Sequence, residues 1–359
     1  MTKDGDFKRL VRERAGRTGQ SYMSARRSLR DTSTPRDEIF PEAVLAGGEL
    51  VEADVEGLER HVSKHPGDVQ ARARLVGYYM LHSGNRRDAR RSHAIWFIAN
   101  QPRSRIAGSP YCRLDFLRDD DSSIQEATAL WLAHIDDSPN DAQLLANARD
   151  WFVARDRRLA IALGERVIEL TNDAGARLQL AAIRRLSGES SDSVLATLGE
   201  RPHHRAELPR WLQSAAWASL WAGQLDYARE LADELLGFAD DDAWYGGNST
   251  HFGHLIRGHV ALAGGDTNAA ERELVAAAAT RGSPQLNSFG PNFSLARALL
   301  EKGRTSAVIT FLDHCRTFWP SPSLRERLGT SIDDRVEAWK STIEAGGIPD
   351  FGANAHYGE

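Results

Sequence analysis

The sequence has little cysteine and no long apolar run. Its 359 residues include only two cysteines, Cys112 and Cys315, which lie far apart in the chain. This excludes a disulfide framework and any CxxC-type zinc site, and it predicts a reducing compartment. The apolar runs fall far short of the ~20 residues that cross a bilayer, and the first residues lack the apolar stretch of a secretory signal. We therefore expect a cytoplasmic protein without membrane spans.

The chain also lacks the signatures of common catalytic and cofactor sites. There is no GxSxG nucleophile motif, no GxxxxGK[ST] phosphate loop and no GxGxxG motif after a strand. His251 and His254 have the spacing of two metal ligands on a helix, but no HExxH motif surrounds them. The adjacent His314 and Cys315 fall on different faces of a helix. We expect no metal, no cofactor and no catalytic activity, with hydrogen-bonded core histidines as the better interpretation of the pair.

Small residues recur with a period that predicts stacked helical hairpins. A small residue and a second small residue twelve positions later recur along the chain, with a glycine at or one residue before the seventh position in every copy except the one at Ala148, as expected where two helices cross around a turn. The six copies begin at Gly77, Ala148, Ala182, Ala216, Gly258 and Ala296. Apolar residues follow a period of 3.6 around these positions, and no useful stretch alternates with period two. We predict an all-α helical-repeat solenoid with essentially no sheet.

Charge and turn residues suggest the domain boundaries. Residues 1–30 carry nine Lys or Arg against three Asp or Glu, whereas the whole chain has a net charge of −5. We expect a basic helix–turn–helix-like head at 1–30, a linker at 31–47, a solenoid at 48–320 and a capping helix with a Gly-rich tail at 321–359. Within the solenoid, residues 48–65 are expected to form a lone capping helix, and irregular segments are expected at 102–122, 240–250 and 280–292.

The repeat spacing resembles the tetratricopeptide family over roughly residues 48–318. Three strings further resemble a bacterial family of tetratricopeptide proteins: SPQLNSFGPN within residues 282–292, the Asn248, His251 and His254 insert, and the tail from Ile348 to Asn354. The segment from Phe7 to Arg30 resembles a short helix–turn–helix found on many unrelated actinobacterial proteins. These resemblances imply an α-α superhelix and imply no reaction.

The tetratricopeptide resemblance also implies a concave groove lined by the first helix of each repeat. The implied partner-binding residues are Arg74, Tyr78, Arg149, Arg177, Arg210, Gln213, Trp217, Trp221, His259 and Arg297. Arginines interleaved with aromatic residues suit an acidic protein or peptide segment, because guanidinium groups bind carboxylates and Trp provides large anchors. The alternative is that these arginines pair with neighbouring acidic residues and that the tryptophans belong to the core. Our leading hypothesis is a non-catalytic protein- or peptide-binding scaffold.

Two further sets of residues support other functions. Two interpretations fit the polar residues of the inserts and the tail, which either line a pocket or only fix irregular backbone: Asn248, His251, His254, Gln285, Asn287, Asn292, Asp350 and Asn354. Such a pocket would favour an enzyme, which is the third hypothesis. The second is a nucleic-acid-linked regulator whose head contacts phosphates through Lys8, Arg9, Arg12, Arg26, Arg27 and Arg30.

Overall fold

The computed structural model describes residues 39–82, 87–115, 119–240, 245–319 and 331–355. These residues form 18 α-helices and two short 3-10 helices, and they include no β-strand, so the all-α prediction is confirmed. The chain divides into two compact units, unit 1 up to Thr171 and unit 2 from Asn172. No helix among the described residues is both long enough and apolar enough to cross a membrane.

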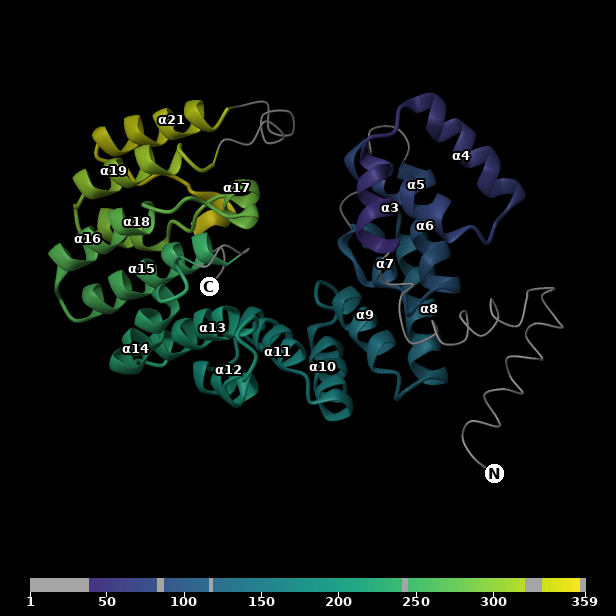
Figure 1. Ribbon diagram of the computed structural model, residues 1–359, viewed down its shortest axis with the longest axis horizontal. Helices are drawn as coiled ribbons and strands as arrows, with labels where there is room; N and C mark the ends of the chain where they lie inside the picture. The colour runs from purple at the N-terminus through teal and green to yellow at the C-terminus, as the bar shows by residue number, and fades with distance from the viewer. Residues whose placement is uncertain (1–38, 83–86, 116–118, 241–244, 320–330, 356–359) are drawn as a thin grey trace. The chain divides into compact units, whose positions relative to one another are not determined.

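Unit 2 consists of neighbouring helices packed in antiparallel pairs (Figure 1). Its helices are α11 (Ala174–Leu186), α12 (Ser191–Leu198), α13 (Leu208–Trp221), α14 (Leu225–Leu236), α15 (Gly246–Ala263), α16 (Thr267–Ala277), α17 (Pro284–Phe289), α18 (Ser294–Leu300), α19 (Ser306–Cys315), α21 (Ile332–Glu344) and η3 (Gly352–Ala355). The pairs α11/α12, α13/α14, α15/α16 and α18/α19 coincide with four of the six repeats expected from the sequence. One continuous apolar core runs through these helices.

The turn glycines of unit 2 explain why the first helix of each pair ends where it does. Gly188, Gly223, Gly265 and Gly303 have φ between 73° and 86°, a left-handed conformation that favours glycine. At α13 the Gly223 amide donates to Leu220 O (3.0 Å), and the next amide donates to Ser219 O (2.9 Å). These bonds satisfy carbonyl groups that the end of the helix would otherwise leave unpaired. Each glycine therefore both ends a helix and directs the chain into its antiparallel neighbour.

Unit 1 is built from similar hairpins but is interrupted by a long non-repetitive segment. Its helices are α3 (Ile39–Gly48), α4 (Glu52–Lys64), α5 (Val69–Leu81), α6 (Arg87–Asn100), α7 (Arg105–Gly108), η2 (Pro110–Cys112), α8 (Asp121–Asp137), α9 (Ala142–Phe152) and α10 (Arg157–Thr171). The pairs α5/α6 and α9/α10 match the remaining two expected repeats. Between α6 and α8, where the sequence predicted an irregular loop, the described residues 101–115 and 119–120 form only the single turn α7 and the 3-10 turn η2.

Helix α3 is a departure from the expected linker. Residues 39–48 are helical and pack against α5 at two glycines. A Cβ on Gly77 would lie 2.0 Å from Val44 O, and one on Gly47 would lie 2.1 Å from Arg74 O. Because both obstacles are backbone atoms, the helices can approach this closely only without side chains at these positions. The small residue at Gly77, which the repeat pattern assigned to a helix crossing, makes its close contact with the segment assigned to the linker.

Candidate binding surfaces

The expected groove residues of unit 2 include a stack of aromatic side chains. Trp217 and Trp221 lie one turn apart on α13, with ring centroids 5.5 Å apart and an interplanar angle of 17°. The ring of His259, on α15, meets both indoles edge-on at 5.5 and 6.0 Å. Trp217 is buried at 1% exposure, whereas Trp221 is 47% exposed. The buried ring of Trp217 therefore packs against the indole of Trp221, which is half exposed to solvent.

Two hollows border Trp221, one on each side of α13. A cavity of about 60 Å³ lies towards α11 and α12 and includes Arg185, Ser214, Trp217 and Trp221 in its lining. A larger hollow of about 470 Å³ lies towards α15, where Trp221, His259 and Leu262 contribute to its wall. Because Trp221 belongs to both, an extended ligand that covers this indole can reach both hollows.

The polar side chains around the aromatic stack differ in how they are paired. Arg210 is exposed and lies on the same face of α13 as Trp217, two turns before it. Neither Arg210 nor Arg185 has an ion-pair partner in the part of the chain that the structure describes. Arg177 donates to Asn172 Oδ1 (2.7 Å), a neutral group. Gln213 is half-buried on the same helix.

His259 contributes to this surface as a neutral group. Its Nε2 lies 2.9 Å from the hydroxyl of Ser294. Burial lowers its pKa from 6.5 to about 4. The imidazole is therefore uncharged at neutral pH, and the positive charge of the surface comes from arginines.

The remaining expected groove residues lie outside the aromatic stack, on α18 of unit 2 and on α5 and α9 of unit 1, and each is ion-paired or at least half-buried. Arg297, on α18, is 53% exposed and forms an ion pair with Glu301 at 3.1 Å. In unit 1, Arg149 is 1% exposed and pairs with Asp150 at 2.8 Å, which removes it from any accessible surface. Arg74 and Tyr78 are half-buried on α5, where Tyr78 stacks on His82.

The insert and the tail of unit 2 meet through hydrogen bonds to backbone. Asn354 Nδ2 donates to Phe289 O (2.8 Å) and Pro291 O (3.0 Å), and its own carbonyl accepts from the Phe293 amide (2.9 Å). The buried Asn292 accepts from the Ser294 amide at 2.7 Å, next to the start of α18. Asp350 accepts from the Gly352 amide at 2.8 Å. These bonds hold the irregular backbone in place. They explain the polar residues of this region, and no ligand is needed to explain them.

The second half of the polar set surrounds the start of α15. Asn248 accepts from the Ser283 hydroxyl at 2.6 Å and donates to Gln285. His251 is fully buried, with Nδ1 2.9 Å from Ala277 O and Nε2 3.0 Å from the Asn292 amide that donates to it. Burial lowers the pKa of His251 to about 4. Asn287 is exposed.

The described histidines do not gather as metal ligands. His254 pairs with Glu273 at 2.7 Å rather than with His251. Among the residues that the structure describes, no group of three or more His, Cys, Asp or Glu side chains is arranged to hold a metal ion. Both cysteines are buried, and burial raises the pKa of each thiol.

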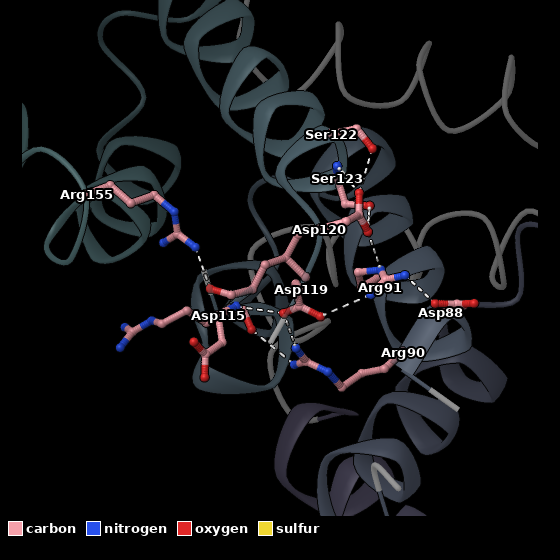
Figure 2. Close-up of polar contacts among 11 residues, drawn as sticks. Asp88, Arg90, Arg91, Asp115, Asp119, Asp120, Ser122, Ser123 and Arg155 are labelled. Atoms are coloured by element: carbon pink, nitrogen blue, oxygen red, sulfur yellow. Dashed lines mark hydrogen bonds and ion pairs between the residues drawn. The ribbon is translucent and has the colours of Figure 1, made fainter. Parts of the chain in front are cut away.

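The non-repetitive segment of unit 1 holds a charged cluster that the sequence analysis did not anticipate (Figure 2). Arg90 is buried and donates to Asp119 Oδ2 (2.8 Å) and to Arg113 O (3.0 Å). Figure 2 shows the carboxylate of Asp119 between the guanidinium groups of Arg90 and Arg91. Arg91 also pairs with Asp120 at 3.0 Å. Residues of α6 thereby fix the chain that leads into α8.

A cleft of about 350 Å³ opens beside this cluster. Its polar lining is Arg87, Arg90, Arg113, Asp115, Asp119 and Arg155, and its apolar lining is Met80, Pro110, Leu114 and Ala154. Arg113 donates to Asp150 O (3.2 Å), and Arg155 donates in return to Leu114 O. Arg155 also lies 3.8 Å above the ring of Trp151. The two arginines thus join the loop and the end of α9 reciprocally.

Lys8, Arg9, Arg12, Arg26, Arg27 and Arg30 all lie outside the described residues. Comparison of the chain with protein-family models and with curated proteins finds no match.

Proposed function

We propose that this chain is a non-catalytic, cytoplasmic interaction protein of tetratricopeptide-type repeats, and that the α13 surface of unit 2 binds an acidic segment of a partner protein. The observation that carries the proposal is the half-exposed Trp221, which stacks on the buried Trp217 between two hollows. The helix pairing and the turn glycines support the repeat assignment.

The aromatic stack suits binding because it is rigid before a partner arrives. Trp221 contacts Trp217 and His259 in the free protein, so its ring gives up little side-chain freedom on binding. Solvent-exposed apolar area on a fixed indole is released from water when a ligand covers it. Buried tryptophans in such positions often carry a large share of the energy of an interface. We therefore expect Trp221 to be the main anchor.

The charges around the stack favour an acidic ligand. Arg185 and Glu189 line the smaller hollow, and Glu189 is paired with Arg184 at 3.7 Å. Arg210 extends the face of α13, and Arg177 bonds only to an amide oxygen among the contacts described. Guanidinium groups without a carboxylate partner bind an incoming carboxylate through paired N–H donors. His259 is neutral and adds no repulsion towards cations or anions. The net preference of the surface is for negative charge.

The proposal can be tested by selecting binders from a random peptide display library on the full-length protein. We expect enriched peptides to combine Asp or Glu with at least one apolar residue. Affinity measured by fluorescence anisotropy should fall about 30-fold for Trp221→Ala, because removal of an anchor costs about 2 kcal/mol. Reversing a nearby charge in Arg210→Glu should weaken binding and reduce its dependence on salt.

A matched control is available on the second helix of the same hairpin. Tyr227, on α14, is 44% exposed, so Tyr227→Ala removes a comparably exposed aromatic side chain from a different face. The enriched peptides should bind Tyr227→Ala as they bind the unaltered protein. Equal binding to Trp221→Ala, or enrichment of basic peptides, would contradict the proposal.

A further inference from the structure

We infer that the hollow between α13 and α15 receives one bulky apolar side chain of the partner, and that the acidic residues of the partner lie on the other side of Trp221, towards α11 and α12. This inference rests on the proposed function, because it names the chemistry of the segment that the α13 surface would bind. It is carried by the different linings of the two hollows that Trp221 borders.

The hollow towards α15 has an apolar lining and a volume of about 470 Å³. The described side chains that line it are those of Leu220, Trp221, Leu225, His259, Leu262 and Ala263. Of these, only His259 is titratable, and burial keeps its imidazole neutral at pH 7 by lowering its pKa to about 4. The walls therefore offer an indole face and aliphatic groups. Covering them removes apolar surface from water, which favours an apolar occupant.

The backbone of this hollow is already paired within the turns that end α13 and α15. Leu220 O accepts from the Gly223 amide (3.0 Å), and Leu262 O accepts from the Gly265 amide (3.1 Å). A carboxylate placed in the hollow would lose water, and the described lining has no cationic side chain to compensate for that loss. The hollow therefore disfavours an acidic residue of the partner and accepts an apolar one.

The hollow towards α11 and α12, of about 60 Å³, offers polar contacts instead. Arg185 contributes a guanidinium and Ser214 a hydroxyl to its lining. Glu189 also lines it, and this carboxylate already pairs with Arg184 at 3.7 Å. A carboxylate of the partner finds a guanidinium and a hydroxyl on this side of Trp221, whereas the described lining of the other hollow has neither. The segment should therefore place its acidic residues towards α11 and its apolar residue towards α15.

The exposed Ala263 provides a way to fill the apolar hollow without altering the aromatic stack. It is the last residue of α15 and lines the hollow, so a leucine at this position would occupy space that the partner's side chain needs. Ala196 is exposed on α12 and lines neither hollow, so Ala196→Leu is the matched control for the same substitution.

Parallel selections from one random peptide display library on the full-length protein, on Ala263→Leu and on Ala196→Leu test the inference. We expect enrichment of Asp and Glu on all three, but enrichment of Leu, Met, Phe or Trp only on the unaltered protein and on Ala196→Leu. In the best peptide from the unaltered protein, replacing the bulky residue by Ala should weaken binding about tenfold, because a buried apolar side chain contributes about 1.5–3 kcal/mol. The same replacement should have almost no effect on binding to Ala263→Leu.

The outcomes separate the inference from the proposed function. Equal selection of bulky apolar residues on Ala263→Leu, or selection of a basic residue in their place, would overturn the inference. Enrichment of acidic peptides that lack any bulky apolar residue would also overturn it, and each of these results would leave the proposed acidic preference standing. Absence of acidic enrichment on all three proteins would contradict the proposed function itself and the inference with it.

A second measurement uses the unaltered protein alone and does not depend on the folding of a variant. Photo-leucine, a diazirine analogue of leucine, replaces the bulky residue of the best peptide, and mass spectrometry locates the crosslinks that form on irradiation. We expect crosslinks within residues 220–225 and 259–263, which line the apolar hollow. Crosslinks mainly within residues 181–194, which line the hollow towards α11 and α12, would place the apolar side chain on the wrong side of Trp221 and overturn the inference.

Discussion

Among the described residues, unit 1 buries four side chains that carry a formal charge, Arg72, Arg90, Asp119 and Arg149. The buried polar side chains of unit 2 are uncharged at neutral pH and are the Ser, Thr and Asn side chains and His251. Part of the difference follows the architecture, since Arg90 and Asp119 hold the interrupted segment, whereas Arg72 and Arg149 lie on α5 and α9 of the regular hairpins. Regular hairpins contain only short stretches of backbone whose N–H and C=O groups lack helical hydrogen bonds, and neutral side chains can pair with these groups. The interrupted segment of unit 1 exposes more carbonyls to the interior, and arginines reach them.

Because their buried polar groups differ, we expect the two units to be destabilised by different changes. A buried ion pair is strongly destabilising when one partner is removed, because the other charge stays buried. A buried neutral hydrogen bond costs less to lose, but an imidazole that accepts one cannot be protonated without breaking it.

The largest effect is expected from Asp119→Ala in unit 1. This change leaves Arg90 buried without its carboxylate, and it should lower the free energy of unfolding of unit 1 by about 3–5 kcal/mol. Hydrogen exchange followed by mass spectrometry should show faster exchange in α6 and α8, with α13 to α16 unaffected. The exposed Asp137→Ala on α8 is the control. Replacing both Arg90 and Asp119 by Leu should restore much of the free energy of unfolding that Asp119→Ala loses. A double variant as unstable as Asp119→Ala would argue against the ion pair as the cause.

The next effect is a loss of stability of unit 2 between pH 6.5 and pH 4. The pKa of His251 falls from 6.5 in the unfolded chain to about 4 in the folded one. In this interval the unfolded state binds a proton that the folded state does not, so the free energy of unfolding decreases as the pH falls. The full effect is about 3 kcal/mol below pH 4, and His259 acts in the same direction.

Urea denaturation at pH 7.0, 5.5 and 4.5, with exchange of α15 and α16 as a local readout, measures this effect. The slope with pH should be flatter in His251→Gln and unchanged in a variant of the exposed His203. In unit 1, burial opposes ionisation of Glu59, but bonds from His93 and Tyr79 lower its pKa below 4.5. The contribution of Glu59 is therefore complete above pH 4.5 and is lost only at lower pH. A slope unchanged by His251→Gln would refute the assignment.

A smaller effect is expected from Ser283→Ala in unit 2. Ser283 donates to Asn248 (2.6 Å), and its oxygen accepts from the Leu286 amide at the start of α17 (3.0 Å). Loss of this cap and of a buried hydrogen bond should cost about 1–2 kcal/mol. Ser288→Ala, at an exposed position of the same helix, should be nearly neutral in the same thermal denaturation. Equal destabilisation by the two changes would mean that the cap is unimportant.

The smallest effect is expected from Arg297→Ala. Arg297 and Glu301 are both 53% exposed and form an i,i+4 pair on α18. Such a pair contributes about 0.3–0.5 kcal/mol, and salt weakens it. A loss above 1 kcal/mol in denaturation at low salt would show that exposed pairs matter more here than the comparison of the two units implies.

The helix pairs were predictable from the sequence because they depend on local chemistry. A glycine that must adopt positive φ, such as Gly223, marks the end of a helix wherever it occurs at the right interval. Helix α3 was not predicted because its fit against α5 depends on close backbone contact at Gly47 and Gly77, which no periodicity reveals.

The candidate surfaces were predictable only in part. Trp217 and Trp221 share a face of α13, but their exposure differs because Trp221 ends the helix and Trp217 packs beneath it. The tetratricopeptide resemblance placed both Arg149 and Arg210 in the groove, although Arg149 is buried beside Asp150 and Arg210 is exposed. The cleft of unit 1 joins residues from α6, the loop and the end of α9, and only the folded chain brings these together.

The bonds that Arg113 and Arg155 donate to backbone carbonyls of each other's segments make the loop and the end of α9 a thermodynamically coupled pair. Each arginine lies on one segment and donates to a carbonyl near the other, Asp150 O or Leu114 O. The first bond already restricts the loop, so the second forms with little further loss of chain entropy. Removing either arginine should therefore sacrifice most of the benefit of both, and a double-mutant cycle should give a coupling energy of about 0.5–3 kcal/mol.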